Sequence, residues 1–114
     1  NAISAPDEVI LYFYQCIFDK KYEEAVQYVV DNSGPLTEER KTELIDELKN
    51  SELVKIIEDQ GLPIEFKANY VEYDSKSIAK VEIEATMKNW PSETDILTAR
   101  LYEGRWMLEY NQRR

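Results

Sequence analysis

The sequence contains no histidine and only one cysteine, Cys16. The absence of histidine removes the commonest general base and the commonest metal ligand in proteins. A single cysteine forms no intramolecular disulfide, and a zinc site is hard to build with so few nitrogen and sulfur ligands. Cys16 stands in an apolar stretch, so we expect a buried thiol with little reactivity. The sequence therefore predicts no metal site, and nothing in it indicates a cofactor.

Long apolar runs are also missing. No segment reaches the roughly 20 apolar residues of a membrane-spanning helix, and the chain does not start with the basic region and apolar core of an export signal. No repeat, low-complexity tract or long linker divides the 114 residues. We therefore expect one domain over residues 1–114, with helices over about 6–60 and strands over about 63–111. A chain of this length buries roughly two thirds of its unfolded surface.

Basic side chains are few, because 14 lysines and arginines stand against 23 aspartates and glutamates, for a formal net charge of −9. The excess lies in the first 60 residues, which hold 14 acidic and 6 basic side chains. An acidic surface repels the phosphates of nucleic acids and of anionic lipids. We therefore expect neither nucleic acid nor an anionic membrane surface as a partner.

Pro6, followed by two acidic residues, predicts the start of a helix, because proline is tolerated and acids are favoured in a first turn. We expect this helix to run to about Phe18. Only a narrow strip of it is polar, and that strip consists of Glu8, Tyr12, Gln15 and Asp19. The helix is therefore predicted to be buried on most sides.

Three further helices are predicted before the strands. The second places four apolar side chains on one face before the turn residues 31–35, namely Tyr22, Ala25, Val26 and Val29. Thr37 and the two acids after it predict the cap of a third helix. The apolar stripe shifts phase near Asn50, so we expect a break there and a short fourth helix that stops at Gly61.

From Ile64 the apolar period changes from about 3.6 residues to 2, which indicates strands with one buried face. The first strand pair is expected to set Tyr70 opposite Val81, Ala68 opposite Ile83, Phe66 opposite Ala85 and Ile64 opposite Met87, with Lys67 opposite Glu84 outside. The next pair is expected to set Ala85, Ile83 and Val81 against Leu97, Ala99 and Leu101, with Glu82 opposite Arg100. Apolar pairs of this kind stabilise neighbouring strands.

The last hairpin has the clearest register. With Glu103 and Gly104 as its turn, Leu101 falls opposite Trp106, Ala99 opposite Leu108 and Leu97 opposite Tyr110. We expect Ile83, Ala99 and Leu108 to lie in the core beneath the first helix. Helices first and strands afterwards predict an α+β fold, with three to four helices on one face of a four-stranded antiparallel meander.

These residues resemble the nuclear-transport-factor-2-like superfamily. The resemblance is carried by Pro6-x-x-Val9-x-x-x-Phe13-Tyr14, by Tyr22-Glu23-Glu24-Ala25, by the alternating strand with Ala79 and Val81, and by Leu101-Tyr102-Glu103-Gly104-Arg105-Trp106. It spans about Pro6 to Tyr110, and its motifs concern packing and turns. More narrowly, the chain is similar to small domains of bacterial lipoproteins and exported proteins.

The resemblance implies a cone, in which helices pack into a strongly curved sheet and often leave a cavity. It also implies an exported protein of the bacterial cell envelope, whose signal is not part of this sequence, and homodimers that form through the sheet. We interpret the start at Asn1 as that of a mature or trimmed chain. The catalytic members of the superfamily, such as ketosteroid isomerase and scytalone dehydratase, carry acids in the pocket.

Asp95 is the first candidate for an acid in a pocket, because it has the same strand phase as Leu97 and Ala99 and is expected to point to the covered face. Desolvation at that face raises the pKa of a carboxyl. The alternative is a solvated position at the rim. Tyr14 and Tyr70 are candidate hydroxyl donors, similar to the tyrosine that polarises a carbonyl in the isomerases. The alternative for both is packing with one hydrogen bond for the hydroxyl.

The two tryptophans have different contexts. Trp106 is expected to pack against Leu101, with a platform for a ligand as the alternative. Trp90 precedes Pro91 in a predicted loop and belongs to no apolar set. It is either folded back over the sheet edge or presented to a partner as an anchor.

The sequence favours a non-enzymatic binding or accessory domain of the cell envelope, with a cone that is filled by side chains or holds a small apolar ligand. The alternative is a pocket enzyme of the isomerase or dehydratase kind, with Asp95 as base and Tyr14 or Tyr70 as donor. A structural oligomerisation module is a third hypothesis. The polarity and openness of the cone distinguish the first two.

Overall fold

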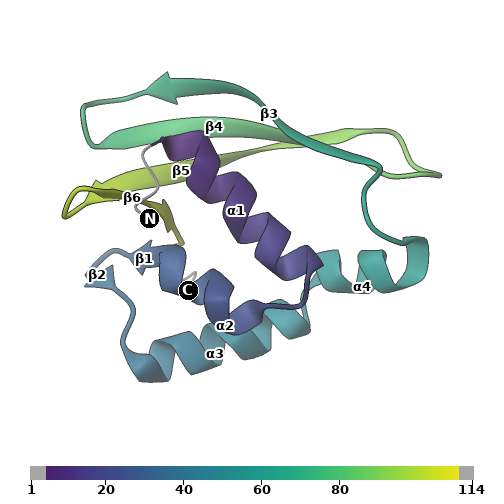
Figure 1. Cartoon of the computed structure of the whole chain (residues 1–114), viewed down its shortest axis with the longest axis horizontal. Helices are drawn as coiled ribbons and strands as arrows, with labels where there is room; N and C mark the ends of the chain where they lie inside the picture. The colour runs from purple at the N-terminus through teal and green to yellow at the C-terminus, as the bar shows by residue number, and fades with distance from the viewer. Residues whose placement is uncertain (1–4, 111–114) are drawn as a thin grey trace.

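The computed structural model describes residues 5–110 and has the predicted α+β architecture (Figure 1). Its helices are α1 (Pro6–Phe18), α2 (Tyr22–Ala25), the short 3-10 helix η1 (Val26–Tyr28), α3 (Glu38–Lys49) and α4 (Glu52–Gln60). Its strands are β1 (Val29–Asp31), β2 (Gly34–Pro35), β3 (Glu65–Tyr73), β4 (Ile78–Thr86), β5 (Glu93–Tyr102) and β6 (Arg105–Glu109). They form one sheet in the order β2-β1-β6-β5-β4-β3. Helix α1 crosses one face of the sheet, α2 lies beside α1, and α3 packs on α2.

Helix α1 begins and ends where the sequence predicts. Pro6 stands in its first turn, and the predicted polar strip is its exposed side. At its other end the N–H of Lys21 donates to the carbonyl of Cys16 over 2.7 Å. Lys20 has a φ of 63°, in the left-handed position that usually carries glycine after a helix. This turn reverses the chain, so that α2 packs back against α1.

The segment after α2 corrects the prediction. A second helix that includes Val29 is wrong, because Val29 lies in β1. Strand β1 pairs in parallel with β6, with Val29 opposite Leu108, and it pairs antiparallel with β2. The sheet therefore has six strands and not four. Val29 and Val30 are β-branched, as strand residues often are, and they pair with a strand about 80 residues away in the sequence, which no local periodicity records.

The helices α3 and α4 confirm their predicted boundaries. The Thr37 hydroxyl accepts a hydrogen bond from the N–H of Arg40 at 3.1 Å, and the Ser51 hydroxyl accepts one from the N–H of Val54 at 3.3 Å. Both are N-caps. Gly61 ends α4 with a φ of 89°, a conformation that glycine adopts without strain. Within residues 5–110, no helix has both the length and the apolar character needed to cross a membrane.

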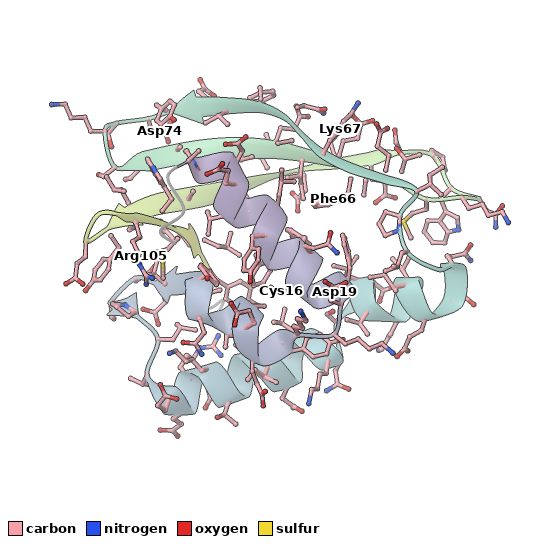
Figure 2. The ribbon with its side chains drawn as sticks, viewed as in Figure 1. Cys16, Asp19, Phe66, Lys67, Asp74 and Arg105 are labelled. Carbon is pink, nitrogen blue, oxygen red and sulfur yellow. The ribbon has the colours of Figure 1, made fainter. Side chains whose placement is uncertain are left out.

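The register of β3 on β4 is confirmed only in its first half. Phe66, Lys67 and Ala68 lie opposite Ala85, Glu84 and Ile83, as predicted. A β-bulge between Ala68 and Tyr70 then shifts the ladder, so Tyr70 lies opposite Glu82 and Val71 lies opposite Val81. The predicted pairing of Tyr70 with Val81 is therefore wrong. Figure 2 shows that Phe66 faces α1 whereas Lys67 lies on the other side of the sheet.

The predicted register of β4 on β5 is wrong by four residues. Val81 lies opposite Leu97, Ala79 opposite Ala99, Ile83 opposite Asp95 and Ala85 opposite Glu93. A four-residue shift preserves the face of every side chain, so the alternation of apolar residues does not distinguish the two registers. Arg100 is not opposite Glu82, and its guanidinium instead pairs with the Glu109 carboxylate at 2.9 Å.

The hairpin of β5 and β6 confirms its prediction. Leu101 lies opposite Trp106 and Ala99 lies opposite Leu108. The turn residues Glu103 and Gly104 have φ values of 51° and 82°, as a two-residue hairpin turn requires. The predicted partner of Leu97, Tyr110, follows the end of β6, and its N–H donates to the carbonyl of Val30 at 2.8 Å.

The core lies between α1 and the sheet. Ile83, Ala99 and Leu108 are all buried in it, as predicted, and the free thiol of Cys16 is buried as well. Every described core side chain is hydrophobic, and no buried side-chain nitrogen or oxygen within residues 5–110 lacks a hydrogen bond. Apolar burial is therefore the main stabilising term in this fold.

The two isoleucines on opposite faces of the sheet provide a matched test of this core. Ile83 is 5% exposed, whereas Ile96 on the outer face of β5 is 52% exposed. Ile83→Ala is expected to lower the free energy of unfolding by about 2–4 kcal/mol, because it leaves a cavity in the core. Ile96→Ala is expected to cost less than about 1 kcal/mol. Urea unfolding midpoints of the two variants measure both effects, and equal losses would contradict the assigned face.

Candidate functional site

A cavity of about 440 Å³ opens at the end of the sheet, between helices α1 and α4 and strands β3, β4 and β5. Most of its wall is apolar. The lining residues are Tyr14, Phe18, Leu53, Ile56, Pro63, Phe66, Ile83, Ala85, Met87, Glu93, Thr94 and Asp95. We call it the cone cavity. Its volume lies in the range of sites that enclose small molecules.

Three aromatic rings form one wall of the cone cavity. Tyr14 and Phe18 lie one helical turn apart on α1, and Phe66 comes from β3. The centroid of the Phe66 ring lies 5.2 Å from that of Tyr14 and 5.2 Å from that of Phe18. Tyr14 and Phe18 share one face of α1, because residues four apart lie on the same side of a helix. Phe66 lies on the covered face of β3 together with Ala68, because residues two apart lie on the same side of a strand.

The acidic end of the cone cavity is formed by β5. Glu93 and Asp95 alternate on the strand face that also carries Leu97, and they lie opposite Ala85 and Ile83. Both are exposed, because β5 begins beyond the cover of the helices. The Asp95 carboxylate accepts a hydrogen bond from the N–H of Ile96 at 2.9 Å. Asp95 thus has the predicted phase, but it lies at the solvated rim that the sequence left as the alternative.

Tyr14 stands at the same cavity. Its hydroxyl makes no hydrogen bond within residues 5–110, and it is not hydrogen-bonded to Asp95. Burial and the nearby charge of Asp95 raise the pKa of Tyr14 to about 12. The hydroxyl is therefore protonated at neutral pH, and it can both donate and accept a hydrogen bond from a bound molecule.

The other two candidate pocket residues do not line the cone cavity. The bulge in β3 places Tyr70 on the outer side, where it is 45% exposed. Trp106 is 7% exposed and packs in the core, and its ring centroid lies 6.1 Å from that of Tyr73. The alternation of apolar residues in β3 does not reveal the bulge. It therefore predicted that Tyr70 faces the helices, whereas the bulge turns Tyr70 to the outer face.

Several lining residues were missed by the sequence reasoning. Leu53 and Ile56 reach the cavity because α4 packs at the end of α1, a placement that the shifted apolar phase of α4 alone did not reveal. Pro63 lines the cavity from the segment between α4 and β3, and Met87 lines it from the segment between β4 and β5. Glu93 could have been found, because it shares the phase of Asp95 two residues away.

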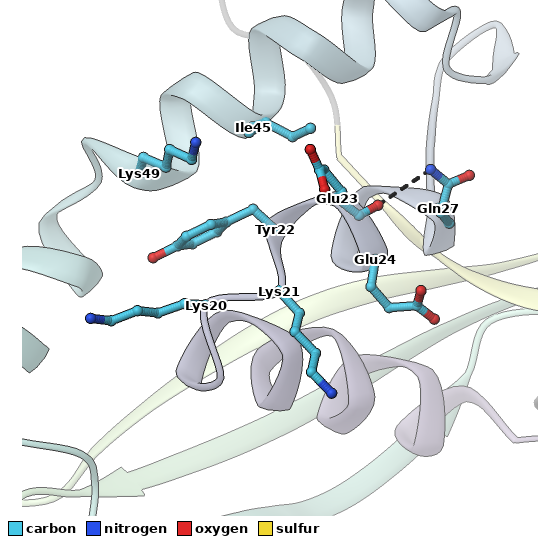
Figure 3. Close-up of a pocket in the computed structure, with 8 residues that line it drawn as sticks. All are labelled: Lys20, Lys21, Tyr22, Glu23, Glu24, Gln27, Ile45 and Lys49. Carbon is cyan, nitrogen blue, oxygen red and sulfur yellow. Dashed lines mark hydrogen bonds between the residues drawn. The ribbon is translucent and has the colours of Figure 1, made fainter.

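A larger cavity, of about 650 Å³, lies on the surface between the end of α1, α2 and α3 (Figure 3). Figure 3 shows Tyr22 between Lys20 and Lys49, with Glu23 and Glu24 on the other side. The Lys49 ammonium lies 5.9 Å from the centre of the Tyr22 ring. Charges of both signs and high exposure make this a solvated groove, so the cone cavity is the better candidate site. Within residues 5–110, no group of three or more His, Cys, Asp or Glu side chains is arranged to hold a metal ion.

Comparison with solved structures identifies similar folds. A nuclear-transport-factor-2-like protein from Campylobacter jejuni, with a provisional designation as a transpeptidase, aligns with a TM-score of 0.68 at 15% identity and covers 87% of this chain and 92% of its own. A nuclear-transport-factor-2-like protein of unknown function from Shewanella oneidensis aligns with a TM-score of 0.49 at 11% identity, over 92% of this chain and 98% of its own. A protein from Kribbella flavida aligns with a TM-score of 0.48 at 10% identity, over 94% and 85% of the two chains. No protein-family model and no curated protein sequence matches the chain.

Trp90 stands in the segment that connects two lining residues of the cone cavity, Met87 and Glu93. It follows the lining residue Met87 by three positions and is 42% exposed. Leu62 and Ile64, which flank the lining residue Pro63, are also exposed, and the N–H of Ile64 donates to the carbonyl of Thr86 at 2.8 Å. These segments therefore present apolar side chains beside the opening, as surfaces for partners often do.

Trp90→Ala is expected to weaken self-association or partner binding and to leave the fold intact. A loss of about 0.5 kcal/mol or less, as for most surface changes, moves the melting temperature by no more than about 3 °C. Trp106→Ala is the matched control, because it removes the buried indole and should lower the melting temperature much further. Calorimetric melting and sedimentation velocity measure the two effects. A large fall in melting temperature for Trp90→Ala would contradict the prediction that Trp90 is a surface anchor.

Proposed function

We propose that this protein, which has the nuclear-transport-factor-2-like fold, binds a small and largely apolar molecule in the cone cavity. The observation that carries the proposal is the composition of the cavity wall, in which eight of the twelve lining residues are Phe, Leu, Ile, Pro, Ala or Met. Apolar pockets with a few polar groups are the usual form of small-molecule sites.

The wall supports binding through burial of apolar surface. A molecule of about 15 non-hydrogen atoms at roughly 0.4 kcal/mol per atom would gain about 6 kcal/mol. This free energy corresponds to a dissociation constant on the order of 10–100 µM. The Tyr14 hydroxyl supplies a polar contact that fixes the orientation of the molecule, because it is protonated and has no partner within the described residues.

The neutral fluorescent probe N-phenyl-1-naphthylamine tests this proposal. We expect saturable fluorescence enhancement, with a dissociation constant on the order of 10–100 µM. Ala85→Trp fills the cone cavity and is expected to abolish the enhancement. Ile96→Trp is the matched control, because it adds the same indole to the outer face of β5 and should leave binding unchanged. Melting curves show whether both variants are folded. A probe that binds equally to both folded variants, or does not saturate, would overturn the proposal.

A second candidate function is a pocket enzyme of the isomerase or dehydratase kind. The observation that favours it is that Tyr14 and Asp95 line the same cavity, where Asp95 would abstract a proton next to a carbonyl and Tyr14 would donate a hydrogen bond to the carbonyl oxygen. The exposure of Asp95 weighs against it, because a hydrated carboxylate is a weak base.

Proton exchange distinguishes the two functions. Cyclohexanone in D₂O loses its α-protons slowly, and NMR follows their replacement by deuterium. The binding function predicts the same exchange rate with the protein as in buffer alone. The enzyme predicts faster exchange that Asp95→Asn and Tyr14→Phe each abolish.

A further inference from the structure

The polar groups of the cone cavity are of two kinds only. Glu93 and Asp95 contribute carboxylates, and Tyr14 and Thr94 contribute hydroxyls. None of the twelve lining residues is lysine or arginine. Three lysines adjoin lining residues in the sequence, but none of them is part of the wall: Lys55 precedes Ile56, Lys67 follows Phe66 and Lys88 follows Met87. The cavity therefore repels a carboxylate or phosphate group and attracts a positive charge.

The aromatic wall adds to this preference. A cation is attracted to the face of a Phe or Tyr ring within about 6 Å, by about 0.5–2 kcal/mol, and ammonium ligands are often held in this way. The rings of Tyr14, Phe18 and Phe66 adjoin one another at the cavity. Tyr14 belongs to the aromatic wall and lines the same cavity as Glu93 and Asp95, so the aromatic wall and the acidic end form parts of one site.

The charge of the whole chain acts in the same direction. The formal net charge is −9, and a field of one sign raises the local concentration of ligands of the opposite sign. The general field alone would attract any cation to any surface, whereas a site at the cone cavity requires Asp95 in particular. A test must therefore separate the local carboxylate from the overall charge.

We propose, on the basis of the proposed function, that the ligand of the cone cavity is an amphipathic amine or quaternary ammonium compound. Its apolar body lies between α1, α4 and the sheet, and its cationic head lies between the ring of Tyr14 and the carboxylates of Glu93 and Asp95. Fatty acids and other apolar anions are excluded from the site by these carboxylates. The geometry thus assigns both the size and the charge of the ligand class.

Three probes with the same ten-carbon chain test the charge preference, each used below its micelle-forming concentration. Decyltrimethylammonium, decanol and decanoate compete with N-phenyl-1-naphthylamine for the cavity, at low salt. We expect decyltrimethylammonium to bind at least about tenfold more tightly than decanol, and decanoate to bind most weakly. The difference should shrink at 0.5 M salt, because the acidic end is exposed and salt screens exposed charges.

Two matched substitutions locate the preference. Asp95→Asn is expected to weaken decyltrimethylammonium about fivefold and to leave decanol unchanged. Asp46→Asn removes the same charge from an exposed position on α3, outside the cavity, and should change the affinity for either probe less than twofold. Phe66→Leu keeps an apolar wall and should weaken the ammonium probe about threefold more than decanol.

The outcomes separate the two proposals. If N-phenyl-1-naphthylamine does not bind, or its binding survives Ala85→Trp, the proposed function fails. If it binds and the three probes displace it equally, or decanoate binds best, the cone cavity holds apolar molecules but the cationic ligand class is wrong. Equal effects of Asp95→Asn and Asp46→Asn would assign the attraction to the overall charge and would also overturn the inference.

Discussion

Helix α1 exposes one polar strip, and the remainder of its surface has to be covered by other elements. Strands β3 to β6 cover one side of it, and α2 and η1 cover another. Its side chains Val9, Ile10 and Phe13 join those of the sheet in a single hydrophobic core. Burial of apolar surface is the main favourable term in folding. The need to bury the apolar sides of α1 therefore accounts for the positions of the sheet, α2 and η1 around it.

The cone cavity is the place where the cover of α1 ends. Helix α1 stops at Phe18, and α4 closes the space only in part, so the apolar wall of the core continues to an opening. Ile83 belongs both to the core and to the cavity wall. A bound molecule would therefore extend the core, and its binding free energy would add to the stability of the folded state. The strand that forms the opening also supplies the carboxylates, since β5 begins beyond the helices.

The candidate site was predictable in part. The phase of Asp95 on its strand and the position of Tyr14 on α1 follow from periods of 2 and 3.6 residues, and both residues line the cavity. Tyr70 was placed with them because its alternation continues that of Phe66, but the bulge in β3 moves it to the outer face. A bulge adds a residue to one strand, and no pattern within that strand records it.

The sequence by itself determined the boundaries of α1, α3 and α4, the cap at Thr37, the turn at Glu103 and Gly104, and the face of most strand residues. These features depend on groups within a few residues of one another. Only the tertiary structure decided the pairing of β1 with β6, the four-residue shift of β5 on β4, and the placement of α4 at the same cavity as Phe18. In each case the alternative arrangements satisfy the local sequence pattern equally well. Their free energies differ only through contacts between segments that are distant in the sequence, and these contacts form only when the whole chain is packed.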